Sequence, residues 1–599
     1  MKILSLYTSS PSTVSIFVDG KILAATHEER FTRKKNDEAF PLHSIKYCLD
    51  YCGIEPFELD GVALASNFMG IFDEILVRKS QWTVSDYLKE QRRRWLPSLL
   101  KNSKPESLLD IFPEKIDTNM YPEEFWINSQ GDPERNNKFS SERELQVANF
   151  LQIPANKVKR IDHHRCHAAY SYYASHFRNE KILAFTVDGL GDGLNATVGI
   201  FDENGHYSRI YETNQCNIGR IYRYITLLLG MKPNEHEFKV MGLAPYGRKK
   251  HAQEAIDIFK STLYVDGINF KWNEKPTDSY YWFKDRLEGV RFDNIAFALQ
   301  AWTEDLLTEW VANCIQHFGI SKIVVAGGVA MNIKAMGKIA LLPEVKDIFV
   351  GGSASDESMG ISAGICLAED LAVANKVNWK SSNVFSLPQL YLGPEGSKDQ
   401  EDSVINAVDH AKFFYVNNPS SKMIAELLVE GKILARCAGR MEFGQRSLGN
   451  RSILADPKDL RVREKINMAI KSRDFWMPFA PIIMDKYQNQ YLDNPKNLQS
   501  PHMTIGFNTT NEGYEAMLAA CHPADRSARP QILTRTINPD LYQILEDFES
   551  LTGRGALLNT SFNLHGYPIV NTPAEAYYVL ENSGLDGLIM NNYIILRKN

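Results

Sequence analysis

Short apolar stretches separated by turn residues open the chain, and this pattern predicts β-strands. Lys2–Leu6, Thr13–Val18 and Lys21–Thr26 each have the length and composition of a strand. Asp19-Gly20 stands between the last two, and such a dipeptide is typical of the tight turn of a β-hairpin. The opening residues therefore predict three strands, the last two of which pair with each other.

The same pattern returns later in the chain. Ile182–Val187 predicts a strand, residues 188–193 a glycine turn, and Ala196–Phe201 a second strand. Residues 322–332 predict a buried strand that runs through two glycines into a turn and a helix. Any one of these glycine turns alone indicates only a tight connection. Their order favours an α/β protein with a duplicated fold of the actin and sugar-kinase type, with a ligand cleft between the halves.

Changes in composition and in hydrophobic pattern along the chain predict the domain organisation. Residues 70–150 are helical in pattern and rich in Trp, Leu, Lys and Arg, so we expect an insertion there. Its basic run at 91–95 is typical of a solvated helix face. The polar stretches 378–384 and 392–397 indicate a linker. We therefore expect a boundary near residue 385, giving domains 1–385 and 386–599.

Composition narrows the function classes. The chain has 599 residues, a formal net charge of −6, 44% hydrophobic and 23% charged residues, which are ordinary globular values. The slightly acidic balance argues against nucleic acid as a partner. No apolar run approaches the roughly 20 residues that span a bilayer, and the first residues lack the pattern of a signal peptide. Eight cysteines in so long a chain predict reduced thiols. We expect a cytoplasmic enzyme without a membrane or nucleic-acid partner.

A histidine pair indicates a metal site. His163 and His167 are four residues apart in a predicted helix, so they project from one face and can share a divalent cation. Asp188 and Asp356 each follow an apolar strand and are the candidate carboxylate ligands. The alternative is that the histidines cap or hydrogen-bond the helix and the aspartates are turn residues. His164 is either an unliganded base or a surface residue.

Arginines cluster with small residues in the last third of the chain. Arg440, Arg446 and Arg451 are interleaved with Gly, Phe, Leu and Ile, a setting that favours an anion pocket over a solvated basic patch. Further donors follow at Lys471, Arg473 and Arg529. Residues 556–563 predict a strand that ends in polar side chains able to hydrogen-bond a nucleotide. The expected anion is a polyphosphate or a mixed anhydride.

Together these stretches resemble the O-carbamoyltransferase family, which includes the nodulation-factor, cephalosporin and aminoglycoside carbamoyltransferases. The similarity runs nearly end to end. Its carriers are residues 28–35 with Phe40-Pro41, the helix of His163 and His167, and residues 187–192, 238–247, 327–332, 439–444, 448–457 and 558–563.

The resemblance implies two active sites. The C-terminal domain resembles the YrdC type, which in this family converts carbamoyl phosphate and ATP, with Mg²⁺ as a possible companion, into carbamoyl-adenylate. By motif, the residues that bind phosphate, carbamoyl group and nucleotide are Arg446, Lys471, Arg529, Asn559 and Ser561. Further binding positions are expected at Lys35, Arg440, Arg451, Arg473 and Asn563.

The N-terminal domain resembles the metal domain of the threonylcarbamoyl-adenosine tRNA-modification enzymes. The resemblance implies that His163, His167, Asp188 and Asp356 hold a metal, usually iron, and that Asn332 contacts a nucleotide. The carbamoyl group would pass from the C-terminal site to a hydroxyl of a small metabolite or sugar. A homodimer is a possible assembly.

The chain departs from the family at the end of its first strand, where Ser10 and Pro11 replace a usual His-Asp pair. This loss removes the obvious base for the acceptor hydroxyl, and His164, Asp192 or the metal would have to replace it. A second hypothesis follows, in which the protein is a partly inactive relative that forms or binds carbamoyl-adenylate and has a regulatory or scaffolding role. A third, a sugar kinase, conflicts with the arginine-rich C-terminal domain.

Overall fold

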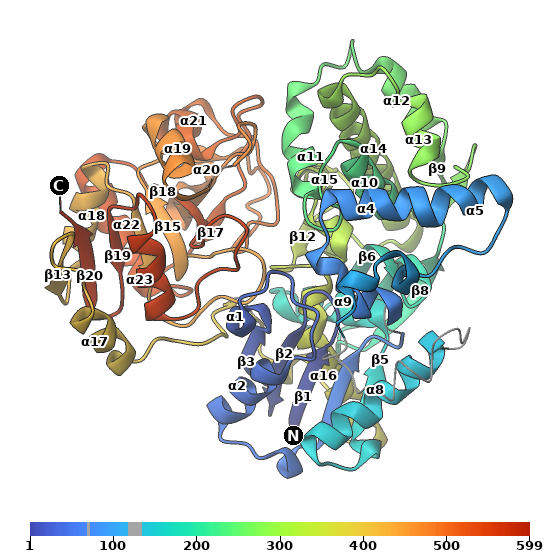
Figure 1. Ribbon diagram of the computed structural model, residues 1–599, viewed down its shortest axis with the longest axis horizontal. Coiled ribbons are helices and arrows are strands. Elements are labelled where there is room, and N and C mark those ends of the chain that lie inside the picture. Colours follow the sequence, from blue (N-terminus) through green and yellow to red (C-terminus); the bar gives the residue numbers. More distant parts are fainter. Residues whose placement is uncertain (69–71, 118–134, 388, 472, 599) are drawn as a thin grey trace.

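The computed structural model describes residues 1–68, 72–117, 135–387, 389–471 and 473–598. Within them the protein is mixed α/β, as the sequence predicts, with three main sheets and helices around them (Figure 1). The predicted insertion at 70–150 is helical where it is described, and residues 70, 71 and 118–134 of it lie outside the described residues. Every described helix is too short or too polar to cross a membrane.

The first two sheets repeat one pattern. In each, the central strand pairs antiparallel with the next strand of a meander, whose third strand follows at the edge of the sheet. On its other side the central strand pairs parallel with a later strand, which pairs parallel with one more. The first sheet has the order β3 (Lys21–His27), β2 (Thr13–Val18), β1 (Lys2–Tyr7), β4 (Gly61–Ala65), β5 (Val158–Ile161). The second has the order β12 (Asp347–Val350), β11 (Lys322–Ala326), β6 (Ile182–Gly191), β7 (Leu194–Phe201), β8 (Tyr207–Thr213). All seven strands predicted at 2–26, 182–201, 322–326 and 556–561 are present.

The third sheet belongs to the C-terminal part of the chain, drawn in orange and red in Figure 1. Its strands, in spatial order, are β13 (Phe413–Asn417), β20 (Tyr593–Arg597), β19 (Gly587–Ile589), β14 (Leu434–Cys437), β15 (Arg451–Ala455), β18 (Ala556–Ser561), β16 (Ala480–Met484) and β17 (Gln531–Leu533). A separate ribbon pairs β9 (Leu263–Asp266) with β10 (Asn269–Trp272). One continuous apolar core contains buried residues of both the second and the third sheet, so the two parts pack as one body.

Helices cover the sheets and carry the functional residues described below. Those of residues 1–174 are α1 (Glu29–Thr32), α2 (Leu42–Cys52), α3 (Phe72–Leu76), α4 (Val84–Glu90), α5 (Leu96–Lys101), α6 (Leu108–Ile111), α8 (Arg135–Leu151) and α9 (His163–Ala174). Those of residues 218–374 are α10 (Ile218–Leu228), α11 (Glu237–Leu243), α12 (Gln253–Lys260), α13 (Tyr281–Arg286), α14 (Phe292–Phe318), α15 (Ile333–Leu341) and α16 (Met359–Ala374). The C-terminal part has α17 (Lys398–Asn406), α18 (Ser421–Val429), α19 (Arg461–Ile466), α20 (Gln488–Tyr491), α21 (Asn511–Ala516), α22 (Pro539–Thr552) and α23 (Pro573–Glu581).

The helix α16 shows how the first two sheets are joined. It is apolar on nearly every side and packs against β1, β2 and β4 of the first sheet and against α9. A helix that is apolar all round must be buried on all faces. Its position holds α9 between the two sheets, with the amino end of α9 at the turn that closes β6.

Candidate functional site

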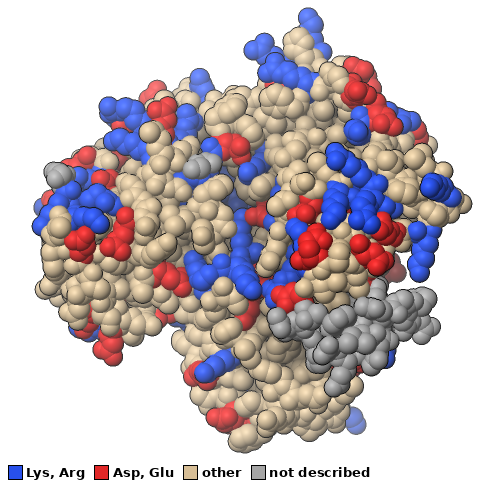
Figure 2. All heavy atoms as spheres, in the orientation of Figure 1, with Lys and Arg blue, Asp and Glu red and all other residues tan. Residues whose placement is uncertain are grey.

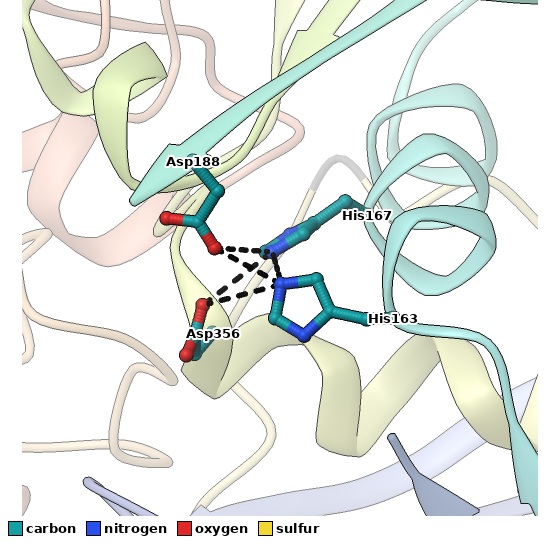
Figure 3. A group of neighbouring side chains, drawn as sticks. All are labelled: His163, His167, Asp188 and Asp356. Carbon is teal, nitrogen blue, oxygen red and sulfur yellow. Dashed lines mark hydrogen bonds and ion pairs between the residues drawn. The ribbon is translucent and has the colours of Figure 1, made fainter. Parts of the chain in front are cut away.

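Two histidines and two aspartates converge on one point (Figure 3). His163 and His167 come from the first turns of α9, Asp188 from β6, and Asp356 from the short turn Asp356–Ser358. His163 Nε2 lies 2.9 Å from Asp188 Oδ2, and His167 Nε2 lies 3.4 Å from Asp356 Oδ1. One ligand atom from each residue falls within 4.8 Å of every other. The four residues predicted as metal ligands are therefore brought together.

Local sequence explains this arrangement. Asp162 caps α9 by accepting a hydrogen bond from the backbone N–H of Arg165, which fixes where the helix begins. His163 and His167 then stand one turn apart on the same face. Gly191 gives the His163 ring its space, because a Cβ at that position would lie 2.1 Å from the ring.

The donor set fits a divalent cation. The two imidazole Nε2 atoms are only 3.1 Å apart and both face the two carboxylates, so their lone pairs repel one another unless a proton or a cation lies between them. Burial opposes a charged ring, yet Asp188 and Asp356 raise the pKa of His167 to about 9. Burial also opposes a charged Asp188, yet the two histidines hold the pKa of that carboxyl well below its usual range. A mixed set of imidazole and carboxylate suits iron, zinc or manganese.

Two further residues support the ligands. The Tyr7 hydroxyl donates a 2.7 Å hydrogen bond to Asp356 Oδ2, and burial followed by the charge of Asp356 raises the pKa of Tyr7 well above its usual value. Sequence reasoning missed Tyr7, although its place at the end of the first strand was the available signal. Asp192, predicted as a catalytic residue, accepts from the backbone N–H of His163 at 2.8 Å and of Phe68 at 2.9 Å. It holds the start of α9 in place, and its catalytic role stays a prediction.

His164 lies inside the fold. Its Nδ1 pairs with Thr186 Oγ1 at 2.7 Å and its Nε2 with the carbonyl of Leu194 at 3.2 Å. Burial, with the charges of His163 and His167, lowers the pKa of His164 to about 3. Both ring nitrogens are thus occupied by protein groups, and the predicted role of His164 as a base stays a prediction.

A second group lies in the C-terminal part at the end of β18. Lys471 Nζ donates to Ser561 Oγ at 3.1 Å and to Asn563 Oδ1 at 2.8 Å. Burial, followed by the positive charges of Arg473 and Lys35, holds the pKa of Lys471 well below its usual value. The predicted binding residues Lys471, Ser561 and Asn563 therefore form one polar cradle.

Three arginines stand beside this cradle. Burial lowers the pKa of Arg446 to about 10, and burial with the charge of Arg446 does the same for Arg473. Burial and then Arg446 and Arg473 lower the pKa of Arg529 well below its usual value. Among the described residues none of the three, nor Lys471, forms an ion pair with an acid, and Arg446 Nε has no hydrogen-bond partner. Figure 2 shows lysine and arginine side chains gathered in the hollow between the N-terminal and C-terminal parts.

Other predicted binding residues hold the fold together. Arg440 donates to the carbonyls of residues 23, 392 and 393, and Arg451, fully buried, donates to carbonyls that include that of Gly439 at 3.0 Å. Asn559 Nδ2 donates to the Ser447 carbonyl at 2.9 Å. Asn332 caps α15. Their predicted contacts with a ligand stay predictions.

Lys35 lies at the edge of the cradle rather than in it. It forms an ion pair with Glu235, and its charge lowers the pKa of Lys471. Lys35 of the N-terminal part is therefore close enough to the polar cradle to act on its charge, and its predicted contact with a ligand also stays a prediction.

A loop of the C-terminal part rests on the loop that carries Asp356. The backbone N–H of Gln445 donates to Ser353 Oγ at 3.0 Å, and the Ser353 hydroxyl donates to Glu357. Arg30 Nη2 donates to the Gly444 carbonyl at 2.9 Å. Arg446 follows directly in the chain. Asp356, a predicted metal ligand, and Arg446, a predicted anion-binding residue, are thus connected through one short chain of contacts, which sequence reasoning did not find.

Comparison with known proteins names the family. The model described as "Carbamoyltransferase N-terminus" matches residues 2–365, and "Carbamoyltransferase C-terminus" matches residues 425–597. An uncharacterized protein of Methanocaldococcus jannaschii is 29% identical over 77% of this chain and 78% of its own length. The nodulation protein NolNO of Sinorhizobium fredii is 28% identical over 97% of this chain and 78% of its own length. The 3'-hydroxymethylcephem-O-carbamoyltransferase of Streptomyces clavuligerus is 27% identical over 42% of this chain and 44% of its own length. The chain therefore belongs to the carbamoyltransferase family and is an enzyme of that type.

Proposed function

We propose that the protein is an ATP-dependent O-carbamoyltransferase with two linked sites. The C-terminal site hydrolyses carbamoyl phosphate to carbamate and phosphate, and a carbamate oxygen then attacks the α-phosphorus of ATP, which releases pyrophosphate and leaves carbamoyl-adenylate. The N-terminal site transfers the carbamoyl group from this adenylate to a hydroxyl of a small metabolite or sugar, or to water when no acceptor is present, and AMP is the leaving group. In this proposal the C-terminal domain is YrdC-like, the repeated sheets are actin- and sugar-kinase-like, and the boundary lies near residue 385. A cytoplasmic location, iron as the metal and a homodimer remain parts of the proposal.

The observation that carries the proposal is a group of cations that form no ion pair with any acid among the described residues. Arg446, Lys471, Arg473 and Arg529 crowd together. The charges of Arg446 and Arg473 lower the pKa values of their neighbours, and a bound anion would offset this repulsion. Triphosphate and carbamoyl phosphate supply such charge. The guanidinium forks would orient the phosphates and offset the charge that develops as pyrophosphate leaves the α-phosphate.

The transfer half of the proposal rests on the metal group. His163, His167, Asp188 and Asp356 would hold the ion, which when bound supplies a Lewis acid for the carbonyl or the acceptor hydroxyl. Tyr7 keeps the Asp356 carboxylate oriented through its hydroxyl. The contacts from Ser353 to the Arg446 loop support an enclosed route between the sites, which protects a water-labile adenylate.

The deciding experiment measures AMP and carbamoylated product separately. Wild-type protein with ATP and carbamoyl phosphate is expected to release AMP, and the Arg446→Ala variant to lose about 10²- to 10³-fold of that rate with its metal content unchanged. Arg461→Ala, at an exposed residue of α19 paired with Asp459, is the control and should match the wild type. A normal AMP rate in Arg446→Ala would refute the C-terminal assignment.

A second candidate function follows from the end of β1. Ser10 and Pro11 stand where a His-Asp pair is usual in the family, which supports a partly inactive relative with a regulatory or scaffolding role. AMP release without carbamoylated product from any member of a hydroxyl library would favour this second candidate.

A further inference from the structure

The helical segment between β4 and β5 carries a group of nitrogen donors without partners. Gln91 Nε2, Arg94 Nε and Nη1, and Trp95 Nε1 are buried and make no hydrogen bond with the described residues. Arg223 Nε, from α10, is likewise buried and makes no hydrogen bond with the described residues. A buried donor without a partner costs about 1–3 kcal/mol, so such atoms gathered in one place call for an explanation.

The backbone conformation is also unusual at these donors. Residues Gln91–Trp95 form a π-helical turn between α4 and α5. Such turns are rare and occur often at functional sites, because they widen the helix and turn its side chains out of register. Three of the residues with unpartnered donors, Gln91, Arg94 and Trp95, belong to this one turn.

The charged side chains around these donors do not all form ion pairs with the described residues. Lys79 Nζ lies 2.7 Å from Glu74 Oε1 and 3.3 Å from Glu90 Oε1, so one lysine takes both carboxylates. Arg94 and Arg223 have no ion pair with the described residues. Their charges nevertheless reach Glu74: burial raises the pKa of that carboxyl, but Lys79, Arg223 and Arg94 bring it below its usual value. Arg94 and Arg223 therefore lie near Glu74, and Arg223 also near Glu90, without an ion pair to either carboxylate among the described residues.

The donor group lies on the side of the metal site. Gly219 of α10 packs against Gly189, the residue after Asp188, and Arg223 follows one helical turn further on the same face. The helical segment also begins near the metal site, because Asp192 accepts a hydrogen bond from the backbone N–H of Phe68. Figure 1 shows α4 lying across α10, above β6 and α9, and the two helices are in contact.

We infer that these donors form an acceptor-binding subsite, and that the acceptor hydroxyl compound carries an oxyanion, a phosphate or a carboxylate, bound by Arg94 and Arg223. This inference rests on the proposed function, because only carbamoyl transfer requires an acceptor. The unpartnered atoms of this segment are all donors, so a ligand with several acceptor oxygens satisfies them, and two guanidinium forks match an oxyanion. Trp95 Nε1 and Gln91 Nε2 add neutral hydrogen bonds.

The first test is a calorimetric titration of the full-length chain with inorganic phosphate. The Arg446→Ala variant is the starting protein, because it weakens phosphate binding at the C-terminal cradle. We expect phosphate still to bind, and a further Arg94→Gln or Arg223→Gln change to weaken that binding about tenfold or more. Arg92→Gln, at an exposed position of the same turn, is the matched control and should leave it unchanged.

Binding that Arg446→Ala alone abolishes, or that neither arginine change weakens, would overturn the inference. Trp95→Phe guards against a folding defect, because it removes one N–H and keeps the ring and the charge. We expect this change to weaken phosphate binding about threefold to tenfold, while the thermal unfolding curve stays close to that of the parent. An unchanged titration with Trp95→Phe would also count against the subsite.

The second test uses matched acceptors, namely glycerol, glyceric acid and glycerol 3-phosphate, with ATP, carbamoyl phosphate and wild-type protein. We expect carbamoylated product from the two acidic members at about tenfold higher kcat/KM than from glycerol, and equal values would contradict the inference. If the wild type forms no AMP, the proposed function fails, while the phosphate titration still decides whether the subsite exists.

Discussion

At the scale of single residues, the sequence predicted which four side chains meet at the candidate metal site but not what surrounds them. The four-residue interval between His163 and His167 is a helical period, and Asp188 and Asp356 each come after an apolar stretch, so the sequence could predict that the four side chains meet. Tyr7 was missed, because its place at the end of the first strand does not reveal its hydrogen bond to Asp356, a residue far away in the chain. The same holds for Arg440 and Arg451, whose donors are used by main-chain carbonyls that only the folded chain brings near.

A substitution of one ligand tests the metal group directly. His167→Ala removes an imidazole from the four-residue set, so we expect metal affinity to fall by more than the 10- to 100-fold that loss of a mere supporting partner costs. Metal content by mass spectrometry after dialysis checks this. His176→Ala, on the surface beside Asp347, is the control. Equal metal in His167→Ala and the parent would show that the ligand assignment is wrong.

At the scale of elements, β6 shows how backbone and site depend on each other. The strand extends to Gly191, four residues beyond the predicted end at Val187, because the hairpin with β7 closes at Gly191 and Leu194. This extension takes the chain past the His163 ring. The apolar stretch predicted the strand only as far as Val187. The residues after it have little strand propensity, and they join the strand because their pairing with β7 outweighs that propensity.

Two glycines of this strand make a matched pair. A Cβ at position 191 would lie 2.1 Å from the His163 ring, whereas a Cβ at position 189 meets no atom within 4 Å. Gly191→Ala is therefore expected to displace His163 and lower metal affinity about tenfold or more, and Gly189→Ala to retain it. Equilibrium dialysis against the metal distinguishes them. Equal losses in both variants would mean that strand flexibility, not space for the ring, matters here.

At the scale of the whole molecule, the two candidate sites depend on contacts between distant parts of the chain. The sequence predicted an α/β protein and a C-terminal anion pocket, since glycine turns and clustered arginines are local signals. It did not predict that the Arg446 loop rests on Ser353, or that the helical segment turns unpartnered donors toward α10. Both depend on how separately folded elements pack, and residue types carry little information on that packing.

An ion pair between distant segments predicts a pH dependence. Burial works against the charged form of Glu235, but Lys35 and Lys232 lower the pKa of its carboxyl to about 2, against about 4.3 in an unfolded chain. A depressed folded pKa contributes stability above the unfolded value, which is lost as pH falls toward 2. Glu235→Gln should thus lower the free energy of unfolding by about 3 kcal/mol at pH 7 and by less as pH drops below about 4.

Urea unfolding of the wild type and Glu235→Gln across this pH range measures the difference. Glu203→Gln, at an exposed residue of the loop after β7, is the control. A difference between wild type and Glu235→Gln that stays constant with pH would rule out the ion pair as its source.

The hydroxyl of Ser353 has a wider consequence. It donates a hydrogen bond to Glu357, beside Asp356, and accepts one from the backbone of Gln445, beside Arg446, so a movement of either loop changes a hydrogen bond of the other. A ligand that displaces one of these loops is therefore expected to be felt at the other candidate site through this single hydroxyl.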